Sequence, residues 1–233
     1  AKKLLQLSAF RYAPTALKPF FWADTNYYNA GIYHSDGAVA YQYNDAAYAA
    51  QLKNASVIGG KQFRVYHFFG PHAPYTVDDA ALTRAAKLSE KHGAPIHMHI
   101  DETAFEVSES LRLYGMRPVE RLARLGIIND RLISVHTVHP DDREIERLAQ
   151  AGASVAHCPS SNLKLASGFA PIAKMMQKGI NIAIGTDSVA SNDKLDMLAE
   201  TRLAAMLGKA TASDPTTMKV FDMLYAATMG GAK

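Results

Sequence analysis

The stretch APIHMHIDET at residues 94–103 decides the fold of this chain. Apolar side chains alternate there with two histidines, so that in a β-strand His97 and His99 point to one face and their apolar neighbours to the other. Glu102 follows in the turn beyond the strand. An imidazole beside a carboxylate suits metal binding and proton transfer. The stretch therefore predicts a buried strand whose carboxyl end carries chemistry.

Outward from this strand, the order strand, loop, helix repeats from residue 63 onwards. Short runs rich in Val, Ile and aromatic residues predict strands at residues 63–69, 94–99, 132–136, 153–157 and 180–185. Longer amphipathic segments, most of them followed by glycine, predict helices at residues 78–92, 118–125, 141–151, 171–178, 193–207 and 215–229. A repeat of about 29 residues is the spacing of a parallel sheet built from βαβ units.

Each predicted strand delivers a histidine or aspartate at or just beyond its carboxyl end: His72, His99, His136, His157 and Asp187. An open doubly wound sheet spreads its strand ends along a line, whereas a (β/α)8 barrel gathers them around one mouth. The polar residues therefore favour an α/β fold of the TIM-barrel type over the open sheet. Residues 1–62 have room for only two more units, so we expect a single, incomplete barrel domain over residues 1–233.

Composition excludes several classes of protein. With 48% hydrophobic residues and no apolar run near 18 residues, the sequence predicts a globular chain without a membrane-spanning helix. A net charge of +3, scattered along the chain, indicates neither a nucleic-acid nor a membrane partner. The single cysteine, Cys158, allows no internal disulfide and predicts a reducing, cytoplasmic setting. The lack of an initiator methionine and of a closing element predicts an excised piece.

The sequence supports a chemical role more strongly for some candidates than for others. His97 lies one pleat deeper in its strand than His99, and we expect it to fill a core position. His136 is a further candidate for the mouth that His99 faces. His72 lies between two prolines that stiffen its loop, which suits a residue that contacts a ligand, but a solvent-exposed turn histidine stays open. His157 precedes a polar loop that either orders a ligand or only turns the chain.

Asp187 ends the last predicted strand of the repeat, in the sequence GTDS. A carboxylate facing the mouth needs a metal or a hydrogen-bonding partner, because burying it alone is costly. The alternative role of Asp187 is to cap the following helix, but Ser191 and Asn192 are available as caps for a helix that starts near residue 193. Cys158 is expected to be packed rather than nucleophilic.

Five motifs, in this order and spacing, resemble the metal-dependent amidohydrolase superfamily: PHAPYTV, HMHIDETAFEV, RPVERL, VAHCPSSNLKLASG and GTDSVASNDKLDM. Within it they are similar to the branch of methylthioadenosine/S-adenosylhomocysteine deaminases and s-triazine chlorohydrolases. The resemblance covers residues 63–233, whereas residues 1–62 match poorly. It implies a (β/α)8 barrel with one divalent metal ion, Zn²⁺ or Fe²⁺, at its mouth.

Carried over by motif position, the resemblance implies roles for five residues. His99 is a metal ligand, and Asp187 is both a ligand and the base that takes a proton from the attacking water. Glu102 contacts the substrate and protonates its ring nitrogen. His136 orients the water, and His72 contacts the substrate.

Two parts of the family pattern are missing. No H-x-H motif of a first barrel strand precedes His97, and the small β domain of the family is absent, which implies a truncated chain. The resemblance implies hydrolytic deamination of a small amino-heterocycle, foremost the adenine ring of methylthioadenosine, S-adenosylhomocysteine or adenosine. An s-triazine-type chlorohydrolase or aminohydrolase, a guanine-type deaminase and a non-catalytic barrel fragment stay open, as does a homo-oligomer.

Overall fold

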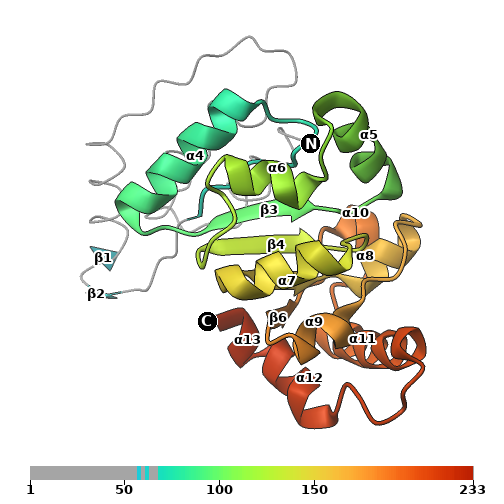
Figure 1. The fold of residues 1–233 in the computed structure, drawn as a ribbon. Helices are drawn as coiled ribbons and strands as arrows, with labels where there is room; N and C mark the ends of the chain where they lie inside the picture. The colour runs from blue at the N-terminus through green and yellow to red at the C-terminus, as the bar shows by residue number, and fades with distance from the viewer. Residues whose placement is uncertain (1–56, 59–60, 63–67, 233) are drawn as a thin grey trace.

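The main sheet of the protein has four parallel strands. The computed structural model describes residues 57–58, 61–62 and 68–232 (Figure 1). The four strands are β3 (Ile96–Ile100), β4 (Leu132–His136), β5 (Ser154–His157) and β6 (Asn181–Ile184). A parallel bridge joins Phe69 to Ile96 of β3. Two short strands, β1 (Val57–Ile58) and β2 (Lys61–Gln62), form a separate antiparallel pair.

The strand order distinguishes the (β/α)8 barrel from the open doubly wound sheet. A doubly wound sheet reverses its strand order at a switch point, whereas the order here is β3-β4-β5-β6, the order of the sequence. Helices lie in every connection between successive strands. The described residues therefore form one arc of a (β/α)8 barrel, which confirms the predicted fold class. Most of the strand predicted at residues 63–69 lies outside the described residues.

Helices connect the strands and cover the sheet (Figure 1). They are α4 (Asp79–His92), α5 (Ala104–Tyr114), α6 (Pro118–Arg124), α7 (Asp142–Ala151), α8 (Pro159–Lys164), α9 (Ile172–Gln177), α10 (Val189–Asn192), α11 (Met197–Ala212), α12 (Val220–Ala227) and α13 (Met229–Ala232). The helices predicted at 78–92, 118–125, 141–151 and 171–178 are confirmed as α4, α6, α7 and α9. Of the helices between residues 68 and 232, none has the length and apolar character needed to cross a lipid bilayer.

Local sequence explains where a helix such as α7 begins and ends. The Asp141 side chain accepts the backbone N–H of Glu144, while the Glu144 side chain accepts the backbone N–H of Asp141, so the two form a capping box. At the other end, Gly152 takes a left-handed conformation with φ of 71°. Glycine adopts that conformation without the steric cost of a Cβ, which makes it a good helix stop.

The two faces of β3 differ in burial. The apolar residues of the strand, with Met98 at their centre, are fully buried in the hydrophobic core. The opposite face carries His97, which lies across from Ile133 of β4, and His99, which lies across from Val135. His97 is exposed. The expectation that it fills a core position is wrong, because its side chain belongs to the strand face opposite to the one that the core covers.

Both predicted ends of the helix at residues 193–207 are wrong. The chain forms α10 first and then α11, whose N-terminal cap is Asp196 rather than a residue at 191–192. Gly208 lies inside α11 and does not end it. A Cβ at Gly208 would overlap the side chain of Met218, so this glycine permits close packing instead of a turn. The helix predicted at 215–229 is divided at Thr228 into α12 and α13.

Candidate active site

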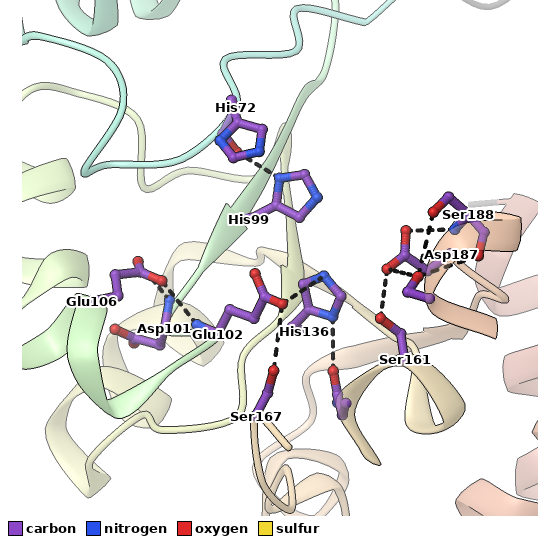
Figure 2. Close-up of polar contacts among 12 residues, drawn as sticks. His72, His99, Asp101, Glu102, Glu106, His136, Ser161, Ser167, Asp187 and Ser188 are labelled. Carbon is purple, nitrogen blue, oxygen red and sulfur yellow. Dashed lines mark hydrogen bonds and ion pairs between the residues drawn. The ribbon is translucent and has the colours of Figure 1, made fainter. Parts of the chain in front are cut away.

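Histidines from three segments meet at the carboxyl ends of the strands (Figure 2). The rings of His99, on β3, and His136, at the end of β4, are stacked with their centroids 5.3 Å apart and an angle of 20° between their planes. The ring of His72, in the loop before α4, has its centroid 4.9 Å from that of His99. The structure thus brings together three of the histidines that the sequence places at one mouth.

The turns that follow the strands contain non-glycine residues in the left-handed region. Asp101 has a φ of 53°, His136 of 68° and Asp187 of 59°. This region is unfavourable for residues with a Cβ, and residues held in it concentrate at functional sites. At His136 it has a visible effect. In the strand register His136 lies opposite Ile100, a buried core residue, yet its ring stacks on His99 of the other face. The left-handed backbone therefore turns His136 towards the mouth.

Hydrogen bonds determine which nitrogen of each imidazole carries the proton. Nδ1 of His99 lies 2.6 Å from the carbonyl oxygen of His72, and Nδ1 of His136 lies 2.8 Å from the amide oxygen of Asn162. Both oxygens only accept, so each Nδ1 carries the proton that it donates, and in a neutral ring of this tautomer Nε2 keeps the lone pair. Burial, the largest cause, lowers the pKa of His136 below its ordinary value. The neutral ring of His136 is therefore prepared as a base or ligand through Nε2, and the hydrogen bond at Nδ1 of His99 directs Nε2 of that ring in the same way.

Glu102 lies beside these rings. Its Oε1 is 3.9 Å from Nε2 of His136 and accepts a long hydrogen bond of 3.5 Å from the hydroxyl of Ser167. The backbone N–H of Glu102 donates to the carboxylate of Glu106 at 3.0 Å. Figure 2 shows the Glu102 side chain between Ser167 and His136. A carboxyl group in this place can exchange a proton with a molecule bound at the mouth.

Asp187 follows β6 and is held by three donors. Its carboxylate accepts from the hydroxyls of Ser161 at 2.6 Å and Ser191 at 2.8 Å, and from the backbone N–H of Ser188 at 2.6 Å. Burial raises the pKa of Asp187, but these hydrogen bonds and the nearby His136 together hold it below its ordinary value. The caps of α10 and α11 are Ser188 and Asp196, so Asp187 is the N-cap residue of neither helix.

The site offers the types of donor atom that a divalent metal binds, but its described side chains are not grouped closely enough to hold the ion. The Nε2 lone pairs of His99 and His136 are directed by hydrogen bonds at the other ring nitrogen, which is how proteins prepare imidazole ligands. Asp187 adds an ionised carboxylate. Nitrogen and oxygen donors of this kind suit zinc, which takes three protein ligands in catalytic sites. Within residues 68–232, however, no three His, Cys, Asp or Glu side chains are grouped closely enough to hold an ion.

His157 is the last residue of β5, and Cys158 follows it as the N-terminal cap of α8. Burial, the largest cause, lowers the pKa of His157 to about 3, so its ring is neutral. Its Nδ1 is buried and has no hydrogen-bond partner among the described residues. Burial likewise raises the pKa of the Cys158 thiol to about 12. Cys158 is thus a packed thiol rather than a nucleophile, as predicted.

Several residues that build the site were not singled out from the sequence. Asn162, Ser161 and Ser167 belong to the polar segment after His157, for which the sequence alone allows either ligand binding or a simple turn. The structure shows that this segment, partly helical as α8, holds His136, Asp187 and Glu102 in place. The many hydroxyl and amide side chains of this segment could have marked it as part of a site, but the residues that they contact lie in distant parts of the sequence.

Comparison with known proteins adds the family to this geometry. The Amidohydrolase family matches residues 15–233, which is nearly the whole chain. The chain belongs to the amidohydrolase family. The family match begins well before residue 63, where the motif resemblance starts.

Curated relatives of this amidohydrolase chain include two nucleoside deaminases. It is 46% identical over 165 residues to the 5-methylthioadenosine/S-adenosylhomocysteine deaminase of Teredinibacter turnerae, covering 71% of this chain and 37% of that protein. It is 43% identical over 170 residues to the 5'-deoxyadenosine deaminase of Methanothermobacter thermautotrophicus, covering 73% of this chain and 40% of the relative. The chain therefore spans less than half the length of these relatives.

Two solved structures are similar in fold. An adenosine deaminase from Xanthomonas campestris with bound zinc is 39% identical and superposes with a TM-score of 0.71, over 92% of this chain and 56% of that one. An atrazine chlorohydrolase from Arthrobacter aurescens TC1 complexed with zinc is 30% identical with a TM-score of 0.65, over 70% of this chain and 36% of that one. Both solved chains are longer than this amidohydrolase-family chain.

Proposed function

We propose that this chain is part of a metal-dependent aminohydrolase that removes the exocyclic amino group from an adenine-type nucleoside. The observation that carries the proposal is the stacked pair of His99 and His136, each hydrogen-bonded through Nδ1, with the Glu102 carboxyl beside His136. The two curated relatives and the adenosine deaminase support the adenine ring as the substrate class. Methylthioadenosine, S-adenosylhomocysteine and adenosine are the proposed substrates.

The proposed cofactor is one divalent ion, with zinc favoured and Fe²⁺ as the alternative. His99 and Asp187 would hold it, because they offer a prepared imidazole nitrogen and an ionised carboxylate. When bound, such an ion supplies Lewis-acid chemistry that lowers the pKa of water towards about 7. The zinc in the two solved relatives supports this choice.

The remaining steps belong to side chains of this chain. Asp187, ionised at neutral pH, takes a proton from the attacking water, whose oxygen adds to the ring carbon that carries the amino group. Glu102 gives a proton to the adjacent ring nitrogen, which makes that carbon electrophilic. The amino group then takes the proton from Asp187 and leaves as ammonia, and the new hydroxyl returns a proton to Glu102 as the carbonyl forms. His136 orients the water through Nε2, and His72 contacts the substrate.

Two other functions are supported by single observations. The likeness to an atrazine chlorohydrolase favours an s-triazine-type chlorohydrolase or aminohydrolase, with a guanine-type deaminase as a further variant. The lack of a three-residue metal cluster within the described ranges favours a non-catalytic barrel fragment. The proposed partner is a small molecule. A cytoplasmic setting, supported by the single buried thiol of Cys158, belongs to the same proposal.

An ammonia-release assay with a zinc measurement tests the proposal. The purified chain is offered methylthioadenosine, S-adenosylhomocysteine, adenosine, guanine and melamine. We expect about one zinc per chain, in line with a single catalytic ion, and ammonia from the adenine nucleosides. Turnover of melamine alone supports the triazine alternative, and a metal-free, inactive protein supports the fragment.

Two substitutions separate metal binding from proton transfer. Glu102→Gln should retain zinc and lose at least about 100-fold in kcat, because an amide cannot donate the required proton. His99→Asn should lose zinc and activity together. Full kcat in Glu102→Gln would remove Glu102 from the acid role, and unchanged zinc content in His99→Asn would remove His99 from the ligand set.

A further inference from the structure

Glu106 makes contacts that the proposed chemistry does not use. It lies in the first turn of α5 and is 1% exposed. Its Oε1 accepts the backbone N–H of Asp101 at 2.9 Å, and its Oε2 accepts the backbone N–H of Glu102 at 3.0 Å. One carboxylate therefore holds two successive amides of the turn that carries Glu102, as Figure 2 shows.

These contacts differ from ordinary helix capping. Thr103 caps α5 by accepting the N–H of Glu106, so Glu106 occupies the third position of the helix. A glutamate there normally reaches back to the N–H of the cap residue itself. In the same chain, Glu144 of α7 does so, accepting the N–H of Asp141. Glu106 instead reaches past Thr103 to the turn between β3 and α5, which is more than its own helix requires.

The two backbone amides that Glu106 binds lie in the turn that positions the Glu102 side chain. Asp101 has a left-handed backbone, so the chain turns sharply before Glu102. A glutamate side chain has several rotatable bonds, and its carboxyl reaches a defined place only if its backbone is held. With both amides fixed, Glu102 Oε1 lies 3.9 Å from Nε2 of His136.

Burying this carboxylate is costly, which argues against a merely structural role. Burial, the largest cause, raises the pKa of Glu106 to about 7 although two backbone hydrogen bonds oppose it. The charged groups that face it are the carboxylates of Glu102 and Glu144, and its charge in turn acts on Tyr75 and Asp101. An uncharged glutamine would cap the helix at less expense of desolvation.

We infer that Glu106 is the positioning residue that holds the proton-donating Glu102 in place through the backbone amides of residues 101 and 102. The inference rests on the proposed function of Glu102. It assigns Glu106 no contact with substrate or metal. Its effect is expected in the rate of the chemical step rather than in substrate binding.

The test compares Glu106→Ala and Glu106→Gln with a matched control in the zinc-loaded protein. Ser89→Ala is the control, because it removes a buried hydrogen bond of 2.6 Å to the carbonyl of Ala94, at the opposite end of β3 from the site. We expect Glu106→Ala to lower kcat about 10- to 100-fold with KM within twofold. Glu106→Gln keeps one acceptor oxygen and should recover part of that loss. Ser89→Ala should lower Tm and leave kcat unchanged.

A second measurement does not depend on activity. Amide hydrogen exchange at Asp101 and Glu102 should become at least tenfold faster in Glu106→Ala and stay at the wild-type rate in Ser89→Ala. Unchanged exchange at both amides overturns the inference even if the wild-type protein releases no ammonia, which by itself defeats only the proposed function. In an active protein, a kcat of Glu106→Ala within twofold of wild type, or a loss matched by Ser89→Ala, also overturns it.

Discussion

Single side chains at the strand ends are kept neutral by their surroundings. His136 has its Nδ1 proton directed to Asn162, and burial lowers its pKa. His157 is enclosed more completely, with 2% of its surface exposed. The low polarizability of the interior disfavours the imidazolium form, so each ring offers a lone pair at neutral pH. The same burial that prepares these rings makes the fold sensitive to acid.

Acid should destabilise the protein through His157. Its pKa is about 3 in the folded chain against 6.5 for the free side chain, so between these values the unfolded state binds a proton that the folded state does not. Stability from this group is complete above pH 6.5 and falls as the pH drops towards 3. Between pH 6.5 and pH 4 the loss should be about 3 kcal/mol.

Urea unfolding of metal-free wild type and His157→Asn checks this at pH 4 and pH 7. His157→Asn should lose much less of its free energy of unfolding than wild type when the pH falls from 7 to 4. His92→Asn is the control, because that ring ends α4 and is only partly buried. Parallel pH dependence in wild type and His157→Asn would show that His157 takes up its proton in the folded state.

At the scale of elements, the packing of α13 against β6 requires glycine at position 230. A Cβ at Gly230 would overlap the carbonyl oxygen of Ile182, a backbone atom that cannot move aside. The side-chain nitrogen Nδ2 of Asn181 donates to the carbonyl oxygen of Gly230 at 3.0 Å and joins the helix to the strand. Gly231, the next residue, has open space, with Ala183 Cβ at 3.9 Å. Two adjacent glycines thus have different roles.

This difference predicts opposite tolerances for the same substitution. Gly230→Ala should destabilise the protein by about 2 kcal/mol, because the added methyl group forces α13 away from β6. Gly231→Ala should change stability by less than about 0.5 kcal/mol, as expected for a substitution into free space. Thermal unfolding of the two variants measures the contrast. Equal Tm values would mean that α13 does not pack on β6 as described.

At the scale of the whole molecule, one buried guanidinium joins three elements. Arg121 of α6 donates to the carbonyl oxygen of Pro74 at 2.6 Å and to the carboxylate of Asp79, at the start of α4. It also lies over the ring of Tyr114, at the end of α5, with 3.8 Å from its central carbon to the ring centroid. The loop with His72 is thereby anchored to the helices outside the sheet. Planar stacking and several directed N–H groups are properties of arginine that lysine lacks.

Arg121→Lys should therefore cost about 2 kcal/mol of stability, since one or more buried carbonyl contacts lose their donor. Arg124→Lys, on the same helix, is the matched control. Its pair with Glu120 is exposed and follows the helical i, i+4 spacing, so the change should cost less than about 0.5 kcal/mol. Chemical denaturation of both variants gives the comparison. A cost for Arg121→Lys no larger than for Arg124→Lys would contradict the anchoring role.

Some elements were predictable from local sequence, and others were not. Helices α4 and α7 have capping residues and a glycine stop in the sequence, and their predicted bounds are confirmed. Helix α8 is six residues long and opens with Pro-Ser-Ser-Asn, a composition typical of loops, so periodicity does not reveal it. Helix α5 was also not predicted. The prediction that a helix ends at Gly208 is wrong. In the sequence, a glycine that ends a helix cannot be distinguished from one that allows close packing of a side chain such as Met218.

The sequence by itself determined the alternation of strands and helices and the types of side chain at the strand ends, because both follow from short-range periodicity and motif spacing. The sequence motifs also identified the amidohydrolase family. Only the tertiary structure decided which nitrogen of His99 and His136 bears the proton, since the partners lie 27 and 26 residues away. It likewise decided that His136 turns from the core side of β4 to the mouth. Such features depend on contacts between segments that meet only when the barrel strands pair.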